Sequence, residues 1–311
     1  MKAIVAHSYG PPEILRLEDV EKPAVEPDQV LVRVRAAGVN PYDWHMLRGS
    51  PFFVRLSEGL RKPKTRLGVD AAGVVEAVGA DVTHVAPGDE VFGARNGSFA
   101  EYASGKNFVP KPARLTFEQA GAVGIAGCTA LQAVRDKGRV QAGQKVLVNG
   151  AAGGVGTFAV QIAKAYGADV TGVCSTRNVE LVRSIGADRV VDYIVVDYTR
   201  EGERYDVIVD CIGNHRLSAS RRALTADGAL VMVGGPLRRI PAALVLAPFV
   251  KQRMGFFMAK INRDDLSALA ELMESGKVTP VIDRTYSLSD APDAIAYLEE
   301  GHARGKVVIT V

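Results

Sequence analysis

A cluster of glycines in the sequence GAAGGVG, residues 150–156, has the residue types and spacing to bind a phosphate group. The apolar run Val146–Val148 before the cluster predicts a buried strand, and the apolar spacing after it predicts a helix. A strand, a glycine-rich turn and a helix begin the βαβ unit that binds a dinucleotide pyrophosphate at a helix N-terminus. Glycine suits this turn because the backbone must bend tightly and approach the phosphates closely. The flanking elements favour this interpretation over a glycine-rich loop without a ligand.

The end of the next predicted strand indicates which dinucleotide binds. A site that prefers NAD usually has Asp or Glu there, to bind the ribose hydroxyls. In this chain the strand ends at Cys174 and is followed by Ser175, Thr176 and Arg177, with no acid. Two hydroxyls and a guanidinium suit a phosphate, which a carboxylate would repel. The sequence therefore favours NADPH, and the alternative is that Arg177 only begins the next helix from a solvated position.

The elements that position the glycine cluster belong to a pattern of alternating strands and helices over residues 123–255, which predicts a parallel sheet covered by helices on both faces. Residues 1–122 contain short strands separated by glycine and proline turns, which predict a rolled or closed antiparallel sheet. The last apolar strand resembles these early strands. We therefore expect an α/β protein in which residues 1–122 and 256–311 form one domain and residues 123–255 form an inserted, doubly wound domain.

Composition narrows the function of this chain of 311 residues. Its net charge of +3 shows no basic tail or stripe, so nucleic acid and anionic membranes are not expected as main partners, although a local cationic pocket remains open. No apolar run approaches the roughly 20 residues of a membrane span, and the N-terminus does not resemble a signal peptide. Cys128, Cys174 and Cys211 are far apart, which argues against disulfides. We expect a cytoplasmic protein whose cysteines pack as small apolar side chains.

Several stretches, in order along nearly the whole chain, resemble the zinc-free quinone oxidoreductase branch of the medium-chain dehydrogenase/reductase superfamily. They are AGVNPYD (37–43), LGVDAAGVVEAVGADVTHVAPGDEVFG (67–93), GSFAEYA (97–103), GCTALQAV (127–134), NGAAGGVG (149–156), GADRVVDY (186–193) and RGKVVI (304–309). The C-terminal half is most similar to NADPH:quinone reductases of the reticulon-interacting-protein type. The resemblance implies a GroES-like catalytic domain with an inserted Rossmann domain, an active site between the two, and a homodimer.

The resemblance also implies roles for individual residues. The family's Asn-x-x-Asp motif, which lies beside the nicotinamide and the substrate carbonyl, falls on Asn40 and Asp43. The residues that match the cofactor site are Thr129 near the nicotinamide, Ala152, Gly153, Gly154 and Val155 in the pyrophosphate loop, Ser175 and Arg177 at the 2′-phosphate, Tyr193 at the adenosine, Cys211, Ile212 and Gly213 at the ribose, and Gly234, Phe257 and Lys306 at or near the nicotinamide.

A metal site is not expected. Zinc alcohol dehydrogenases of the same superfamily have a cysteine where this chain has Asn40, and Gly-His-Glu where it has Gly68, Val69 and Asp70. Asparagine and valine do not replace a thiolate and an imidazole as zinc ligands. His45 stands alone, and a lone histidine is more often a packed or surface residue than a ligand. Without a Lewis acid to stabilise an alkoxide, alcohol oxidation is not expected.

The expected reaction is NADPH-dependent reduction of a quinone or of the C=C bond of an α,β-unsaturated ketone. Asn40 is the first candidate to donate a hydrogen bond to the developing oxyanion. Tyr42 is either the proton donor or a cleft wall, and Asp43 is expected to orient backbone groups or cap its helix rather than act as an acid. Trp44, Phe52 and Phe53 form either an apolar wall for flat substrates or part of the core.

Two other functions remain open. One is an enzyme restricted to enones or enoyl thioesters, which the sequence does not separate from a quinone reductase. The other is an NADPH-binding protein with a sensing or structural role and no activity.

Overall fold

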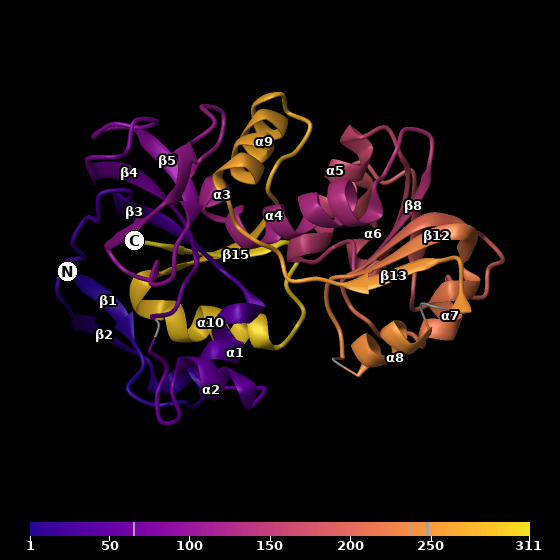
Figure 1. Cartoon of the computed structure of the whole chain (residues 1–311), viewed down its shortest axis with the longest axis horizontal. Helices are drawn as coiled ribbons and strands as arrows, with labels where there is room; N and C mark the ends of the chain where they lie inside the picture. Colours follow the sequence, from indigo (N-terminus) through magenta and orange to yellow (C-terminus); the bar gives the residue numbers. More distant parts are fainter. Residues whose placement is uncertain (65, 237, 247–248) are drawn as a thin grey trace. The chain divides into compact units, whose positions relative to one another are not determined.

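The computed structural model describes residues 1–64, 66–236, 238–246 and 249–311 (Figure 1). The chain divides into two compact units. Unit 1 comprises Met1–Ala126, Ile261–Glu274 and Pro280–Val311, and unit 2 comprises Gly127–Lys260 and Ser275–Thr279. None of the described helices is long and apolar enough to cross a bilayer.

Unit 1 is built on a seven-stranded sheet. Its strands lie in the order β14 (Ile282–Ser287), β15 (Lys306–Thr310), β3 (Val30–Val39), β4 (Asp70–Val78), β5 (Glu90–Ala94) and β7 (Asn107–Pro110), with β6 (Tyr102–Gly105) also paired to β3. β15 pairs with β3, so the C-terminal segment completes the first sheet, as predicted. β14 and β15 lie outside residues 1–122, for which an antiparallel sheet was predicted, and these two strands are parallel to each other. The chain between these two strands runs through a helix, the connection that a parallel pair requires.

Alternation in β3 shows how the sheet faces its core. Val30, Val32 and Val34 are buried, whereas Arg33 and Arg35 point outward to solvent, which is the period of two of a half-buried strand. The same core receives one face of the C-terminal helix α10 (Ala291–Glu299).

The remaining elements of unit 1 surround this sheet. They are the antiparallel pair β1 (Lys2–Val5) and β2 (Arg16–Asp19), the 3-10 turns η1 (Pro12–Ile14) and η5 (Leu288–Asp290), and the helices α1 (Pro41–Arg48), α2 (Phe53–Glu58), α3 (Phe117–Gly121) and α9 (Arg263–Glu274). The sequence PYDWHMLR predicts a helix over residues 41–48, because proline suits a first turn, and α1 occupies these residues and ends at Gly49. Thr116 also predicts a helix start, and it caps α3, its hydroxyl accepting a hydrogen bond from the amide of Gln119 at 3.3 Å.

Unit 2 contains a six-stranded, fully parallel sheet. Its order is β10 (Arg189–Asp192), β9 (Asp169–Cys174), β8 (Lys145–Asn149), β11 (Tyr205–Asp210), β12 (Leu224–Met232) and β13 (Arg253–Phe256). Figure 1 shows α5 (Gly154–Ala165) and α6 (Val179–Ser184) on one face, and α7 (Leu217–Arg222) and α8 (Arg239–Leu246) on the other. This is the doubly wound Rossmann arrangement, so the predicted α/β fold class is confirmed.

The strand order of unit 2 reverses between β8 and β11. From β8 the chain steps outward through β9 to β10, and from β11 it steps in the other direction through β12 to β13. In open parallel sheets, dinucleotides bind beyond the carboxyl ends of the strands at such a reversal. The loops that follow β8 and β11 are the glycine cluster and residues 211–213, which are therefore neighbours at this position.

One helix begins earlier than its pattern predicts. The apolar spacing of residues 129–139 predicts a helix there, but α4 spans Gly124–Leu131 and continues as a π-helical turn over Gln132–Gly138. The amide of Ile125, in the first turn, donates to Oδ1 of Asp70 at 2.7 Å. A carboxylate from a distant strand thus satisfies an N-terminal amide, and local periodicity does not reveal such a contact.

Candidate active site

In unit 1, α1 is held in place by the carboxylate of Asp43. One oxygen, Oδ2, accepts the amide of Asn40 at 2.8 Å, and the other, Oδ1, accepts the amide of Gly68 at 2.9 Å. Asp43 is fully buried, and these bonds join the start of α1 to the turn that precedes β4. This is the geometry of a residue that caps a helix and orients backbone groups, the role preferred for Asp43 from the sequence.

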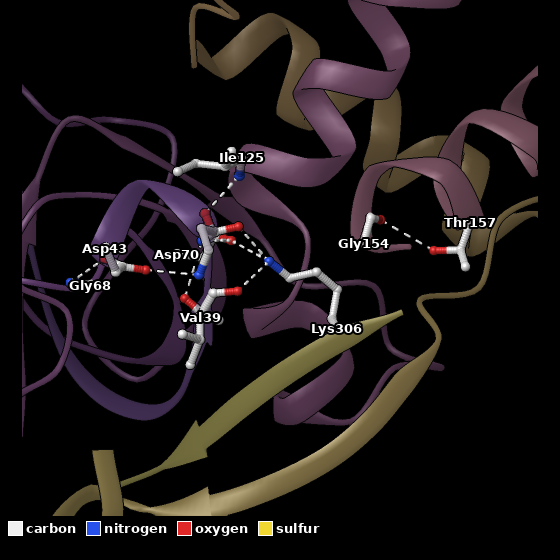
Figure 2. A network of polar contacts seen from close by, with 10 residues as sticks. Val39, Asp43, Gly68, Asp70, Ile125, Gly154, Thr157 and Lys306 are labelled. Carbon is white, nitrogen blue, oxygen red and sulfur yellow. Dashed lines mark hydrogen bonds and ion pairs between the residues drawn. The ribbon is translucent and has the colours of Figure 1, made fainter. Parts of the chain in front are cut away.

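Next to this cap lies a buried network around the ammonium group of Lys306. In Figure 2, Nζ of Lys306 points toward Asp70 and the backbone of Val39. It donates to the carbonyl of Val39 at 3.0 Å and to Oδ1 of Asn40 at 2.5 Å, and it lies 3.5 Å from Oδ2 of Asp70. Lys306 is 3% exposed and Asp70 is fully buried. The network joins β3, β4 and β15.

This network corrects the predicted role of Asn40. Nδ2 of Asn40 donates to Oδ2 of Asp70 at 2.9 Å and to the carbonyl of Gly38 at 3.2 Å, which uses both of its hydrogens. Asn40 therefore has no side-chain donor left for an oxyanion, and the structure makes it a positioning residue. Val39, Asn40 and Asp70 receive the three hydrogens of Lys306, whose expected position near the cofactor stays a prediction.

Burial dominates the electrostatics of this network. It raises the pKa of Asp43 to about 7, against the hydrogen bonds from Asn40 and Gly68 that favour the ionised form. Burial also raises the pKa of Asp70 and lowers that of Lys306, and in each case the opposite charge of the partner counteracts the shift. The close contact between these two side chains is that of an ion pair, because each removes the cost of burying the other charge.

The aromatic residues that follow Asn40 have different surroundings. Tyr42 packs partly against the core of unit 1, and desolvation by burial raises its pKa, whereas the nearby Asn96 side chain favours the ionised form. Trp44 packs against the same core, but Phe52 and Phe53 are exposed, so only the tryptophan belongs to the core.

A pocket of about 330 Å³ opens in unit 1 next to the network. Its lining includes Val69, which precedes Asp70, together with Ala94, Asn96 and Asn107. The side chain of Asn96 also interacts with the hydroxyl of Tyr42, so Asn96 connects this hydroxyl to the wall of the pocket.

In unit 2, the glycine cluster has the geometry of a phosphate loop. A Cβ on Gly156 would lie only 2.0 Å from the carbonyl oxygen of Gly150, so this position admits no side chain. Gly153 is the N-cap of α5. The amides of Gly154 and Val155 stand in the first turn, where no helical carbonyl precedes them as an acceptor. The loop therefore presents backbone donors at the positive end of a 12-residue helix.

The end of β9 provides the polar group predicted for the 2′-phosphate. Ser175 is half-buried and accepts a hydrogen bond from Nδ2 of Asn178 at 3.2 Å. Thr176 and Arg177 are exposed in the short 3-10 turn η3 (Thr176–Asn178). The amide of Tyr193, after β10, donates to the carbonyl of Cys174 at 3.0 Å, so Tyr193 lies beside this end of β9.

Sequence reasoning missed the residue that joins the loops of unit 2. Asp210, at the end of β11, is fully buried. Its Oδ1 accepts Nδ2 of Asn149 at 2.8 Å and the amide of Gly213 at 2.8 Å, and its Oδ2 accepts Nη1 of Arg239 at 2.7 Å. Asn149 directly precedes the glycine cluster, so one carboxylate fixes the loops after β8 and β11 and the start of α8. A single acid that ends the apolar run Tyr205–Asp210 was the available signal.

The other predicted cofactor residues are divided among several positions in unit 2. The side chain of Ile212 approaches Gly150, because a Cβ there would lie 2.7 Å from Ile212. The amide of Gly234 donates to the carbonyl of Asp210 at 3.3 Å, which places it in the same group of loops. Thr129 is buried in α4. Phe257 follows β13, with Nζ of Lys137 5.7 Å from its ring centre.

The cysteines behave as small apolar side chains, as expected. Cys128 and Cys174 are buried and all three thiols are free of disulfides. Burial raises the pKa of Cys174 to about 11 and also raises that of Cys211. Neither thiol is therefore activated as a nucleophile near neutral pH.

Known proteins match this chain along its whole length. The family described as an alcohol dehydrogenase GroES-like domain matches residues 26–113, and the family described as a zinc-binding dehydrogenase matches residues 185–309. The mitochondrial NAD(P)H oxidoreductase RTN4IP1 of Mus musculus is 36% identical, with 100% of this chain and 89% of that protein covered. The chloroplastic quinone-oxidoreductase QR1 of Triphysaria versicolor is 34% identical, with 99% and 98% covered. The structure of the quinone oxidoreductase from Coxiella burnetii has a TM-score of 0.89 and 33% identity, with 100% and 99% covered.

Proposed function

This chain belongs to the quinone oxidoreductase-like group of the medium-chain dehydrogenase/reductase superfamily, and we propose that it uses NADPH, without zinc, to reduce a quinone or a related conjugated carbonyl. It is an NAD(P)H-dependent oxidoreductase that acts on a small molecule. The observation that carries the choice of NADPH is the end of β9, where Ser175, Thr176 and Arg177 stand in place of an acid.

The residues of unit 2 fit the parts of NADPH by their chemistry. The amides of Gly154 and Val155 suit the pyrophosphate, and Ser175 and Arg177 suit the 2′-phosphate, with Tyr193 beside them. Bound NADPH supplies a hydride, and the quinone takes up this hydride and one proton to become a hydroquinone while NADP⁺ is formed. Asp210 keeps the two loops in place through Asn149 and Gly213.

In this proposal Tyr42 stabilises the developing oxyanion and donates the proton. The hydroxyl of Tyr42 carries its proton at neutral pH, and burial raises its pKa further, so it is suited to donate a hydrogen bond to the developing oxyanion before the proton is transferred. Tyr42 also lies next to Asn96 in the wall of the 330 Å³ pocket, which we assign to the acceptor. Asn40 and Asp43 position the start of α1, on which Tyr42 stands.

Independence of zinc is supported by the network around Lys306. Asn40 and Asp70 stand where the zinc enzymes of the superfamily have cysteine and glutamate, and in this chain an ammonium group already lies between them. Among the residues that the structure describes, no three His, Cys, Asp or Glu side chains are grouped to hold a metal ion. A second cation at this position would be repelled by Lys306.

The acceptor and the cofactor are tested together by following nicotinamide oxidation. We expect turnover of 1,2-naphthoquinone and 9,10-phenanthrenequinone with NADPH, slower turnover with NADH, and no loss of rate after treatment with a metal chelator. A panel of enones and enoyl thioesters separates the alternative reductase. Tight NADPH binding without turnover of any acceptor would instead support a sensing or structural role.

Cofactor preference has its own variant. R177A removes a charge-assisted contact with the 2′-phosphate, so we expect the KM for NADPH to rise roughly ten- to hundredfold, with little change for NADH. R183A is the matched control, because Arg183 is exposed on α6 and pairs with Glu180. Equal effects of R177A on both cofactors would remove Arg177 from the 2′-phosphate site.

The homodimer and the cytoplasmic location are further parts of this proposal. Light scattering of the purified protein tests the first, and cell fractionation tests the second.

A further inference from the structure

The segment of residues 52–66, all of which the structure describes except residue 65, exposes large apolar side chains outside the contacts described for the candidate active site. It contains α2 and the loop that follows, and Figure 1 shows α2 at the edge of unit 1 directly after α1. Four apolar side chains of this segment are mostly exposed: Phe52 at 65%, Phe53 at 59%, Leu56 at 67% and Leu60 at 66%. Four large, mostly exposed apolar side chains on one short segment indicate a binding surface.

The packing of α2 keeps this apolar face turned outward. Val54 is buried in the core of unit 1. Arg55 donates to the carbonyls of Gly49 and Arg48 at 3.2 and 3.3 Å, and its guanidinium lies 4.7 Å from the ring centre of Tyr9. Because Val54 and Arg55 are anchored, α2 cannot rotate to bury Phe53 and Leu56.

A tight turn brings basic side chains next to this apolar face. Gly59 has a φ of +128°, and the amide of Lys64 returns to donate to the carbonyl of Glu58 at 3.0 Å. The hydroxyl of Tyr9 donates to the carbonyl of Gly59 at 2.6 Å and fixes the turn. The turn carries the exposed cations Arg61, Lys62 and Lys64, and Arg66 is exposed just beyond it. None of the four forms an ion pair with a described residue.

Charge is concentrated in this segment to an unexpected degree. Residues 52–66 contain five Lys and Arg side chains and one Glu, whereas the whole chain has an excess of only three positive charges. The rest of the chain is therefore slightly acidic. The net charge of +3 leaves a local cationic site open, and this segment is where the positive charge is concentrated.

We propose that residues 52–66 bind the protein peripherally to an anionic lipid surface. Apolar side chains surrounded by Lys and Arg are the composition of elements that lie in a membrane interface. A second copy of this chain does not suit the surface, because a symmetric contact would bring the two positively charged segments together. Phe52 and Phe53 are able to stack on bases, but Leu56 and Leu60 are not, so the lipid surface is favoured and RNA binding is an outcome of the test.

Residues 52–66 follow shortly after the helix that carries Tyr42, which relates the proposed membrane surface to the source of the acceptor. α2 follows α1, which carries Tyr42, so the bound membrane lies beside the catalytic helix of unit 1. Long-chain quinones dissolve in lipid, and we assign the acceptor to this source. This assignment rests on the proposed function, whereas the membrane binding itself does not.

Vesicle sedimentation tests the surface. The full chain should sediment with vesicles of equal parts phosphatidylcholine and phosphatidylglycerol, only weakly with pure phosphatidylcholine, and less in high salt. R61Q/K62Q should lower the partition coefficient by about thirtyfold, from two lost basic side chains, and L56S/L60S by at least about tenfold. The controls are R204Q/K277Q and I194S/V195S, which change exposed residues elsewhere and should bind as the wild type does.

Activity measurements distinguish this proposal from the proposed function. L56S/L60S should reduce soluble 1,2-naphthoquinone at the wild-type rate but reduce a long-chain quinone held in the anionic vesicles at least about tenfold more slowly. Vesicle binding without reduction of any quinone would overturn the function and leave the surface standing. Wild-type protein that does not bind the vesicles would overturn the surface. The surface would also be overturned if the L56S/L60S variant bound the vesicles as well as the wild type does. It would likewise be overturned if L56S/L60S left vesicle binding unchanged and weakened only dimer formation or only binding to an RNA oligomer.

Discussion

Each unit holds a buried ion pair, Lys306 with Asp70 in unit 1 and Arg239 with Asp210 in unit 2. In unit 1 the ammonium group has three oxygen partners, and Asp70 also accepts the amide of Ile125 and the side chain of Asn40. In unit 2 only Nη1 of Arg239 is satisfied, and Nε and Nη2 have no partner among the described residues. The cation is therefore essential to the first network, whereas in the second the carboxylate holds the loops.

The largest effect is expected from K306M. This change leaves Asp70 as an uncompensated buried charge and also removes donors from Val39 and Asn40, so the free energy of unfolding should fall by about 3–5 kcal/mol. Urea unfolding measures it. K277M, at an exposed lysine, is the control and should change stability by less than about 0.5 kcal/mol. A loss below about 1 kcal/mol for K306M would show that the network tolerates the Asp70 carboxylate without its cationic partner.

A smaller effect is expected from R239M. The change removes the partner of Asp210, but it also removes two buried donors that have no partner, and Asp210 keeps Asn149 and Gly213. These terms offset each other, so we expect a loss of about 1 kcal/mol. The same unfolding experiment checks it. A loss as large as that of K306M would mean that the two pairs are equivalent.

The pH dependence of unit 1 separates Asp43 from the ion pair. Asp43 loses its proton near 3.8 in the unfolded chain but near 7 in the folded state. Between these values the folded state binds more protons, so this group makes stability fall as pH rises, by at most about 1.4 kcal/mol per pH unit. D43N loses one acceptor and is less stable throughout, but its stability should change less between about pH 4 and pH 7. Urea unfolding at several pH values measures the slope, and an unchanged slope would assign it to other groups.

The smallest effect is expected at a pair that is not buried. Arg48 and Glu299 form two hydrogen bonds of 2.9 Å between α1 and α10, with both side chains about one-third exposed. Solvent screens such a pair, so R48Q should lower the unfolding free energy by about 0.5 kcal/mol. Urea unfolding of R48Q and K306M gives the ratio of the stability lost at an exposed ion pair to that lost at a buried one in the same unit. If R48Q and K306M lost a similar amount of unfolding free energy, burial would not be the main determinant of what an ion pair contributes.

Local patterns allowed much of the fold to be predicted. The glycine cluster, the acid-free end of β9 and the proline that begins α1 are each read within a few residues, and the structure places all three as expected. The parallel pairing of β14 and β15 and the early start of α4 depend on contacts between distant segments. They have no local pattern, and both were missed.

The same distinction explains the site. Asn40 and Asp43 were found by their motif, but the role of Asn40 depends on Asp70 and Lys306, which are 30 and 266 residues away. A lone acid within the apolar run that begins β4, and a lone lysine at the start of β15, were the available signals. Neither indicates its partner. The charge of residues 52–66 was visible in the sequence, but the anchoring of Val54 and Arg55, which turns the apolar face outward, was not.

During synthesis, unit 1 is completed only when its last strand emerges from the ribosome. β15 lies between β14 and β3 and carries the counter-charge of Asp70, yet it follows residues Gly127–Lys260 of unit 2 in the chain. Domains generally fold as they emerge, so unit 2 is able to fold while part of β3 and the Asp70 carboxylate still lack their partners. An unpaired strand edge invites pairing with other chains. The interval before β15 appears is therefore the stage at which the nascent protein most needs a chaperone.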